Sequence, residues 1–183
     1  MRVVAFDAMG TVFDLGDLRE SVGFRRVLHH AAALTLAGEW APFDELAKAV
    51  DPELPERLAR VRAYPEAREA FEAVRAAGGE PWVLTNGTRD ATEQLLDRSR
   101  IFAEVHTVEE VRRYKPHADV YAIMPPRATL VAAHAWDVVG ARAAGYHAVW
   151  IDREEREWPL PLPEPALRAN DLLEAAEVAI GTD

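Results

Sequence analysis

Residues 3–14 read VVAFDAMGTVFD. The first four of them are β-branched or apolar, and the run stops at a carboxylate, Asp7. A short apolar run of this kind is typical of a strand that is buried on both faces of a sheet. The Gly10-Thr11 pair that follows favours a turn. We therefore predict a central strand that carries Asp7 at its carboxyl end.

Beyond residue 64 the chain alternates between segments typical of strands and segments typical of helices. Strands are predicted at residues 82–84, 102–107, 128–132 and 148–151, and helices at residues 65–77, 89–98, 119–124, 137–144 and 171–180. Pro65 and Gly78 mark the two ends of the first of these helices, and Asn170 is the expected N-cap of the last. Strands that alternate with helices pair in parallel through right-handed crossovers. The sequence thus predicts an α/β domain of three layers.

Residues 16–63, which we call the helical insert, interrupt this alternation. They are rich in Ala and Leu with helical spacing, and no strand is expected in them. Proline disrupts the interior of a helix, and the prolines that divide the insert are Pro42, Pro52 and Pro55. We predict a core domain formed by residues 1–15 and 64–183, with the insert after the first strand. A charged and Pro-rich linker is expected at residues 152–165.

The composition excludes several classes of protein. The 183 residues are enough for one hydrophobic core with a small insert. The formal net charge of −10 disfavours binding to nucleic acid or to anionic membranes. The absence of cysteine rules out disulfides, thiolate catalysis and Cys-based zinc sites. No apolar run approaches the ~20 residues of a membrane span, and the N-terminus has no signal-peptide pattern, so we expect a cytoplasmic protein.

Polar side chains follow four of the predicted strands. Along the chain they are Asp7, Thr85, Asn86, Lys115, His134 and Asp137. Ligands of open parallel sheets bind beyond the carboxyl ends of the strands, so we expect these groups to converge on one crevice. Each alone is common in a turn, at a helix terminus or on the surface; the ordered set is what indicates a site. One carboxylate can attack an electrophile and form an ester, an ammonium can hold that carboxylate ionised, and hydroxyl or amide groups can stabilise developing negative charge.

Four motifs in this part of the chain resemble those of the haloacid dehalogenase (HAD) superfamily. They occupy residues 7–14 (DAMGTVFD), 84–87 (LTNG), 114–116 (YKP) and 135–141 (AWDVVGA). They occur in the order of the superfamily and cover nearly the whole core, which makes the resemblance specific. It implies a Rossmann-like parallel core in which the helical insert forms a cap.

Two positions separate the branches of this superfamily. Its phosphatases carry a second Asp where this chain has Met9, and methionine cannot transfer a proton. They also carry a further acid where this chain has Ala133, so that only Asp7 and Asp137 remain if magnesium binds. The chain instead resembles the L-2-haloacid dehalogenase branch. Like this chain at Met9, that branch has a non-acidic residue at the position of the second Asp. It also has an Ala-Trp-Asp run in its fourth motif, and it needs no cofactor.

The resemblance to the L-2-haloacid dehalogenase branch implies a reaction on a small anionic 2-haloacid. Asp7 would displace halide from the α-carbon and form an ester, which water then cleaves. Halide is a good leaving group and needs no general acid, which makes Met9 compatible with this chemistry. The other candidate catalytic residues are Lys115, Asp137 and His134. The candidate substrate-binding residues are Met9, Thr11, Thr85, Asn86 and Tyr121.

The chain departs from that branch in three places. Ala132 and His134 stand where the branch has Ser and Asn, and our hypothesis is that His134 substitutes as a base or hydrogen-bond donor. From Asp7 to Thr85 the chain runs only 78 positions, so the cap is shorter than the resemblance implies. The cap arginine that receives halide has no clear counterpart, and the candidates by location are Arg19, Arg25 and Arg26.

Two other functions stay open. One is a Mg²⁺-dependent HAD phosphohydrolase with degenerate motifs, which would act on a phosphomonoester only with metal. The other is a HAD-like binding protein without catalysis. Ala132 and the short cap favour it, whereas the retained Asp7, Lys115 and Asp137 oppose it. A homodimer is an alternative to a monomer, because dimers are common among soluble proteins.

Overall fold

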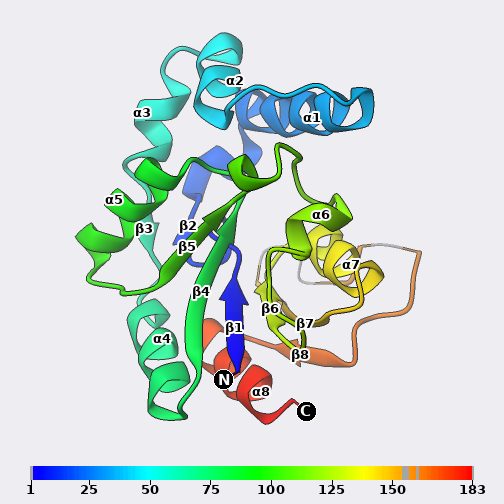
Figure 1. The fold of residues 1–183 in the computed structure, drawn as a ribbon. Helices are drawn as coiled ribbons and strands as arrows, with labels where there is room; N and C mark the ends of the chain where they lie inside the picture. The colour runs from blue at the N-terminus through cyan, green and yellow to red at the C-terminus, as the bar shows by residue number, and fades with distance from the viewer. Residues whose placement is uncertain (1, 154–156, 160, 183) are drawn as a thin grey trace.

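The computed structural model describes residues 2–153, 157–159 and 161–182. Its main sheet has six parallel strands in the order β5-β4-β1-β6-β7-β8 (Figure 1). Their bounds are β1 Val3–Phe6, β4 Glu80–Thr85, β5 Glu104–Thr107, β6 Thr129–Ala132, β7 His147–Ile151 and β8 Leu167–Ala169. All four residues of β1 are buried, because this strand lies inside the sheet and helices cover both faces of the sheet.

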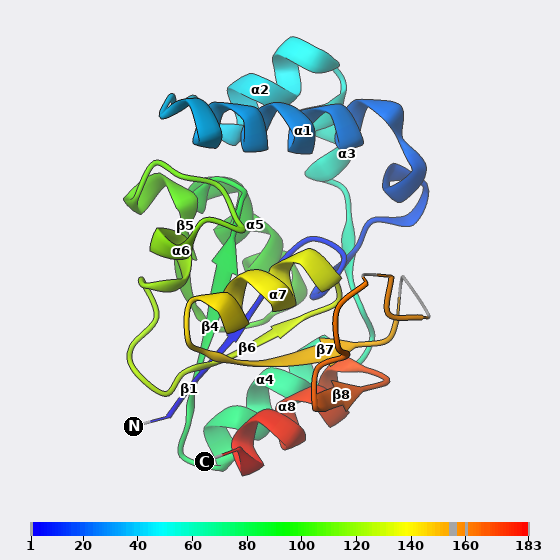
Figure 2. The same ribbon diagram turned by 90° about the vertical axis from the view of Figure 1, so that its right-hand side faces the viewer.

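Helices cover both faces of this sheet. α4 (Ala67–Ala76) and α8 (Leu172–Gly181) pack against each other on one face, and α7 (Ala135–Ala143) lies on the opposite side of β6 and β7 (Figure 2). α5 (Arg89–Ser99) packs against β5, and α6 (Ala118–Tyr121) packs against α7. The α/β fold of three layers is therefore confirmed, and its parallel sheet is Rossmann-like.

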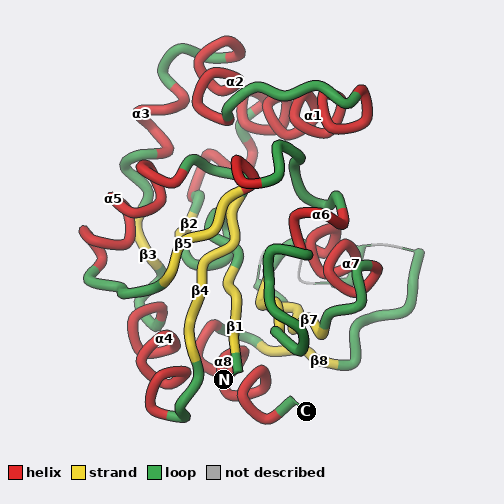
Figure 3. Tube along the Cα trace, in the orientation of Figure 1, coloured by secondary structure: helices red, strands yellow, loops and turns green. Residues whose placement is uncertain are grey.

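The helical insert folds into a separate group of helices. These are α1 (Val22–Ala37), α2 (Phe43–Val50) and α3 (Leu54–Leu58), preceded by the 3-10 helix η1 (Gly16–Glu20). Figures 1 and 3 show them beyond the carboxyl ends of β1 and β4, where the polar side chains of the motifs are expected. In the described part of the chain, no helix is both long enough and apolar enough to span a membrane.

A two-stranded ladder joins the insert to the core. β2 (Phe13–Asp14) pairs antiparallel with β3 (Arg62–Ala63), and the Tyr64 N–H donates to the Val12 carbonyl at 3.0 Å. The expectation that residues 16–63 contain no strand is thus wrong at β3. A strand of two residues has no periodicity that a sequence pattern could reveal, because only its pairing with β2 defines it.

Tyr114 fixes the insert to the core just before Lys115. Its N–H donates to Thr35 Oγ1 at 2.9 Å, and its hydroxyl donates to the Ala41 carbonyl at 2.7 Å. Its ring stacks on Trp40, with the two centroids 4.9 Å apart. Because these contacts join the last turn of α1 and the segment between α1 and α2 to the loop that carries Lys115, they hold the insert over the sheet.

The structure differs from the prediction at a strand start, at an unpredicted strand and at a helix N-cap, besides shifts of one to three residues at other boundaries. β5 begins at Glu104 instead of residue 102, and Phe102 is 74% exposed. β8 has no counterpart among the predicted strands, because it is three residues long and pairs only with β7 at the edge of the sheet. The N-cap of α8 is Asp171 instead of Asn170, since the Asp171 side chain accepts the Glu174 N–H at 2.9 Å.

The predicted linker at residues 152–165 is described only in part, since residues 154–156 and 160 lie outside the described residues. Trp158 packs edge-on against the buried Trp150, with the ring centroids 5.3 Å apart. This contact ties the segment to the core next to β7.

Candidate active site

Asp7 lies at the carboxyl end of β1 with its side chain almost fully buried. Its N–H donates to the Val131 carbonyl of β6 at 3.0 Å, which extends the sheet pairing through this residue. Its Oδ2 accepts the Thr11 hydroxyl at 2.9 Å, and its Oδ1 accepts Lys115 Nζ at 3.0 Å. The carboxylate is thus held by two donors from different loops, and each oxygen keeps a lone pair for chemistry.

Lys115 bridges the two buried carboxylates of the site. Its Nζ lies 3.0 Å from Asp7 Oδ1 and 2.7 Å from Asp137 Oδ2. Burial alone would lower the pKa of Lys115, but the negative charges of Asp137 and Asp7 outweigh it and raise the pKa above its ordinary value. The side chain is therefore an ammonium that holds both carboxylates.

Asp137 lies in the first turn of α7 and is fully buried. Its Oδ1 accepts the Tyr121 hydroxyl at 2.6 Å. Burial raises the pKa of Asp137, and Asp7 raises it further, whereas Lys115 and the Tyr121 hydrogen bond lower it. The net direction is upward, which makes Asp137 a stronger base than an ordinary carboxylate.

Gly140 allows α7 to approach Pro116 and Tyr121 closely. A Cβ at this position would lie 2.7 Å from Pro116 Cβ and 2.8 Å from Tyr121 Cε2, both closer than real contacts allow. Any larger residue would push the Tyr121 ring away, and with it the hydrogen bond to Asp137. The glycine of the fourth motif therefore has a packing role here.

Thr11 connects the loop after β1 to the strand beside it. Its hydroxyl accepts the Ala133 N–H at 3.0 Å, so its single proton is directed to Asp7. Arg153 supports the same loop by donating to the Thr11 carbonyl at 3.3 Å, and its guanidinium lies 3.7 Å from the centroid of the Tyr64 ring. The position of the Asp7 carboxylate is thus set by contacts among residues of the core on both sides of the insert.

Thr85 is the last residue of β4 and Asn86 follows it, and both line the same site as Asp7. The Asn86 Oδ1 accepts the Lys115 backbone N–H at 3.0 Å, which leaves the Nδ2 hydrogens of the amide as donors. The Thr85 hydroxyl oxygen accepts the Gly87 N–H at 3.0 Å. This turn therefore presents amide and hydroxyl donors beside Asp7.

His134 stands at the start of α7. Its Nε2 lies 3.0 Å from the Met9 carbonyl and must donate, because a carbonyl oxygen only accepts. Its ring stacks on Trp136 at a centroid distance of 5.5 Å and an angle of 12°. His134 is thus oriented by the loop of the first motif on one side and by Trp136 on the other.

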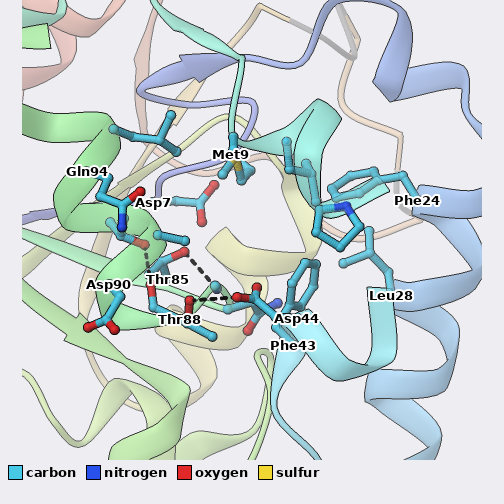
Figure 4. A pocket seen from close by; sticks show the side chains of 18 of the residues that line it. Asp7, Met9, Phe24, Leu28, Phe43, Asp44, Thr85, Thr88, Asp90 and Gln94 are labelled. Atoms are coloured by element: carbon cyan, nitrogen blue, oxygen red, sulfur yellow. Dashed lines mark hydrogen bonds between the residues drawn. The ribbon is translucent and has the colours of Figure 1, made fainter. Parts of the chain in front are cut away.

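A cavity of about 260 Å³, which we call the Asp7 cavity, separates the insert from the core (Figure 4). Five predicted site residues line it: Asp7, Met9, Thr85, Asn86 and His134. Thr11, Lys115, Tyr121 and Asp137 do not line it; they lie behind Asp7 and contact its carboxylate or one another. The structure therefore brings all nine predicted residues together, but it divides them between a cavity surface and a buried support.

The opposite wall of this cavity has no counterpart among the predicted site residues. It is formed by apolar side chains of the insert, which are Phe24, Leu28, Phe43, Pro55 and Leu58. Trp136, which belongs to the quoted fourth motif, also lines the cavity. The sequence signal for the wall is the apolar spacing of the insert helices, which indicates burial but not what the buried face meets.

The three candidate arginines of the insert take different positions. Arg19 pairs with Asp14 at 3.5 Å, and Arg26 is exposed on α1. Arg25 lines a neighbouring cavity of about 260 Å³ that also contacts Lys115. Among the described residues that line the Asp7 cavity, none is an arginine or a lysine.

The residues of the site do not fit a magnesium ion. The described residues contain no group of three or more His, Asp or Glu side chains placed to hold a metal. An ammonium lies between Asp7 and Asp137, and the two phosphatase positions are Met9 and Ala133, which offer no oxygen ligand from their side chains. The geometry therefore argues against the magnesium phosphohydrolase.

Proteins of similar sequence are haloacid dehalogenases. The chain is 26% identical to haloacetate dehalogenase H-2 of Moraxella sp. (strain B), over 84% of this chain and 86% of that protein. It is 28% identical to (S)-2-haloacid dehalogenase 1 of Pseudomonas sp. (strain CBS-3), over 84% of this chain and 85% of that protein. No family model matches the chain.

Solved structures agree with this result at the level of the fold. L-2-haloacid dehalogenase from Xanthobacter autotrophicus with chloropropionic acid covalently bound has a TM-score of 0.83 at 20% identity, over 99% of both chains. A HAD phosphatase from Thermococcus onnurineus has a TM-score of 0.70 at 21% identity, over 97% of both chains. With the sequence relatives, these likenesses confirm the predicted resemblance to the L-2-haloacid dehalogenase branch of the HAD superfamily.

Proposed function

We propose that this protein is a 2-haloacid dehalogenase that needs no metal and uses Asp7 as its covalent nucleophile. The observation that carries the proposal is the single ammonium of Lys115 between two buried carboxylates, one of which faces an apolar cavity. The sequence relatives support it, since those named as haloacid dehalogenases match most of this chain.

In the first step, an oxygen of Asp7 attacks the α-carbon of the haloacid. A carbon–oxygen bond forms as the carbon–halogen bond breaks, and the halide leaves with the electron pair. Lys115 and the Thr11 hydroxyl hold the carboxylate in place for this attack. The Nδ2 hydrogens of Asn86 and the Thr85 hydroxyl are the donors that meet the anionic substrate in the cavity.

In the second step, water attacks the carboxyl carbon of the ester on Asp7. The ester bond to the substrate oxygen breaks, the 2-hydroxyacid leaves and the Asp7 carboxylate is restored. Asp137, whose pKa is raised by burial, is the carboxylate that accepts one proton of water; the other proton of water ends on the leaving substrate oxygen, and Lys115 balances the charge. His134 lines the cavity from which this water approaches the ester.

The proposal is tested by chloride release from (S)-2-chloropropanoate in the presence of EDTA. We expect release without added metal and a product of inverted configuration, (R)-lactate, because the α-carbon is attacked once. A phosphomonoester with Mg²⁺ is the comparison substrate. Hydrolysis of the phosphomonoester without any chloride release would overturn the proposal, and so would a lactate of retained configuration.

As the pH is lowered, the Tyr121→Phe variant is expected to lose activity earlier than the wild type does, at a higher pH. The Tyr121 hydroxyl donates to Asp137 and lowers its pKa, so its removal raises that pKa. Asp137 must be ionised to accept a proton, so the acid limb of kcat moves toward higher pH. The measurement is the pH profile of kcat.

Tyr146→Phe is the matched control for this prediction. The Tyr146 hydroxyl donates to the Met124 carbonyl at 2.8 Å, away from both carboxylates, so its loss leaves the profile unchanged. An acid limb of Tyr121→Phe that stays with the control, or moves toward lower pH, would show that Tyr121 does not support an ionised Asp137.

We also propose residues 16–63 as the cap of the enzyme and residues 1–15 and 64–183 as its core. The contacts of Tyr114 support a cap that keeps bulk water from the ester while it forms and breaks. The cytoplasmic location and the homodimer remain predictions, for which fractionation of cells and the mass of the protein in solution are the tests.

A further inference from the structure

The size of the Asp7 cavity exceeds what the smallest haloacids need. Its volume of about 260 Å³ corresponds to about nine water molecules at ~30 Å³ each. It approaches the ~300 Å³ at which pockets for larger organic ligands begin. A haloacetate or a chloropropanoate bound at Asp7 would therefore leave part of the cavity to be filled by water or by a longer substituent.

The side of the cavity opposite Asp7 is apolar. Phe24 and Leu28 reach it from α1 and Phe43 from α2, and Figure 4 shows all three across the cavity from the carboxylate. Leu58 of the insert belongs to the same wall, and Leu95 of α5 adds apolar surface to the cavity from the core. Water held against such a surface makes few hydrogen bonds, so an apolar substituent of the substrate is the favoured occupant.

The charges around the cavity oppose a second anionic group on the substrate. Asp44 and Asp90 line it together with Asp7, and no described lining residue is an arginine or a lysine. Asp44 is held across the boundary between insert and core, since it accepts the Thr88 hydroxyl at 3.3 Å. A distal carboxylate would meet two negative charges there, whereas an alkyl chain meets the apolar wall.

We propose that the preferred substrates are 2-haloalkanoates whose unbranched alkyl chain at the α-carbon is several carbons long. This proposal rests on the proposed function and names its substrate class. The carboxylate and the halogen lie beside Asp7, and the chain extends to Phe24, Leu28 and Phe43. Each buried methylene then contributes about a fourfold gain in kcat/KM until the cavity is full.

The test is bromide release from the (S) enantiomers of 2-bromopropanoate, 2-bromobutanoate, 2-bromohexanoate and 2-bromooctanoate, with 2-bromosuccinate as the dianionic comparison. We expect kcat/KM for 2-bromohexanoate to exceed that for 2-bromopropanoate by at least about 10-fold. The value for 2-bromosuccinate falls below that for 2-bromopropanoate. A constant or falling kcat/KM along the series overturns the proposal but leaves the proposed function standing. No bromide from any acid overturns both.

Two variants probe the wall itself. Ala91→Leu fills the cavity from α5 and is expected to remove most of the advantage of 2-bromohexanoate while 2-bromopropanoate is still processed. Leu28→Ala shortens the wall and moves the optimum toward longer chains. Ala33→Leu is the matched control, because Ala33 is an exposed residue of α1 that lines neither of the two cavities described above. A chain-length preference that is the same in all three variants contradicts binding of the chain in this cavity.

Discussion

Chloride release by the Asp7→Asn variant is expected to fall by at least about 10⁴-fold in kcat. An amide is too weak a nucleophile to displace halide, and without the attacking carboxylate no ester forms. The measurement is chloride release from (S)-2-chloropropanoate without metal. Asp97→Asn removes the same charge from an exposed position on α5, and this matched control keeps the activity of the wild type.

The same substitution is expected to leave the fold intact. Asp7, Lys115 and Asp137 form a buried group of two carboxylates and one ammonium, which carries a net negative charge. Asp7→Asn leaves a neutral ion pair, so the free energy of unfolding changes by no more than about 1 kcal/mol. A folded Asp7→Asn protein that still releases chloride at the wild-type rate would show that Asp7 is not the nucleophile.

Labelled water distinguishes attack by Asp7 from activation of water by Asp7. In a single turnover in H₂¹⁸O with enzyme in excess, we expect the label in the peptide that contains Asp7 and an unlabelled hydroxyl in the lactate. This follows because the oxygen delivered to the substrate comes from the Asp7 carboxylate, and an oxygen atom of water then replaces it in the carboxylate. A label in the lactate alone would mean that water attacks the substrate directly.

The residues at the strand ends are predictable from the sequence for a topological reason. The carboxyl ends of parallel strands meet at one edge of the sheet, so a sequence needs only to mark where each strand ends. Asp7 after β1 and Asn86 after β4 are found in this way. Asp137 follows β6 by a few residues and lies in the first turn of α7, where its carboxylate faces back to the same edge.

What the sequence cannot assign is whether the side chain of each site residue lines the cavity or lies buried behind it. Thr11 and Tyr121 match positions expected to bind substrate, yet both are fully buried and bond to Asp7 and Asp137 instead. This depends on how α6 and α7 pack at Gly140, which no local pattern encodes. The wall of Phe24 and its neighbours depends likewise on how the insert packs over the core, where the β2–β3 ladder and Tyr114 attach it.

The Lys115→Met variant is expected to lose both stability and activity. Methionine has a similar length but no charge, so Asp7 and Asp137 are left as buried carboxylates without a cation between them. Breaking a buried ion pair of this kind costs about 3–5 kcal/mol of unfolding free energy at pH 7. The loss in kcat is at least about 10³-fold, because the nucleophile and the hydrolytic base both lose their charge partner. Urea unfolding and halide release are the measurements.

The pH dependence of that stability loss identifies its cause. Lys115 lowers the pKa of Asp137, so its removal raises that pKa in the folded protein, above the value of the unfolded chain. A raised carboxyl pKa means that the folded state binds more protons than the unfolded state, so the stability of the variant falls as the pH rises. The deficit against the wild type is therefore smaller at pH 5 than at pH 7. Lys48→Met, the same change at the only other lysine of the chain, lies exposed on α2 and shows no such dependence. An equal deficit at both pH values would mean that Lys115 stabilises the fold by packing alone, and not as the cation that two carboxylates share.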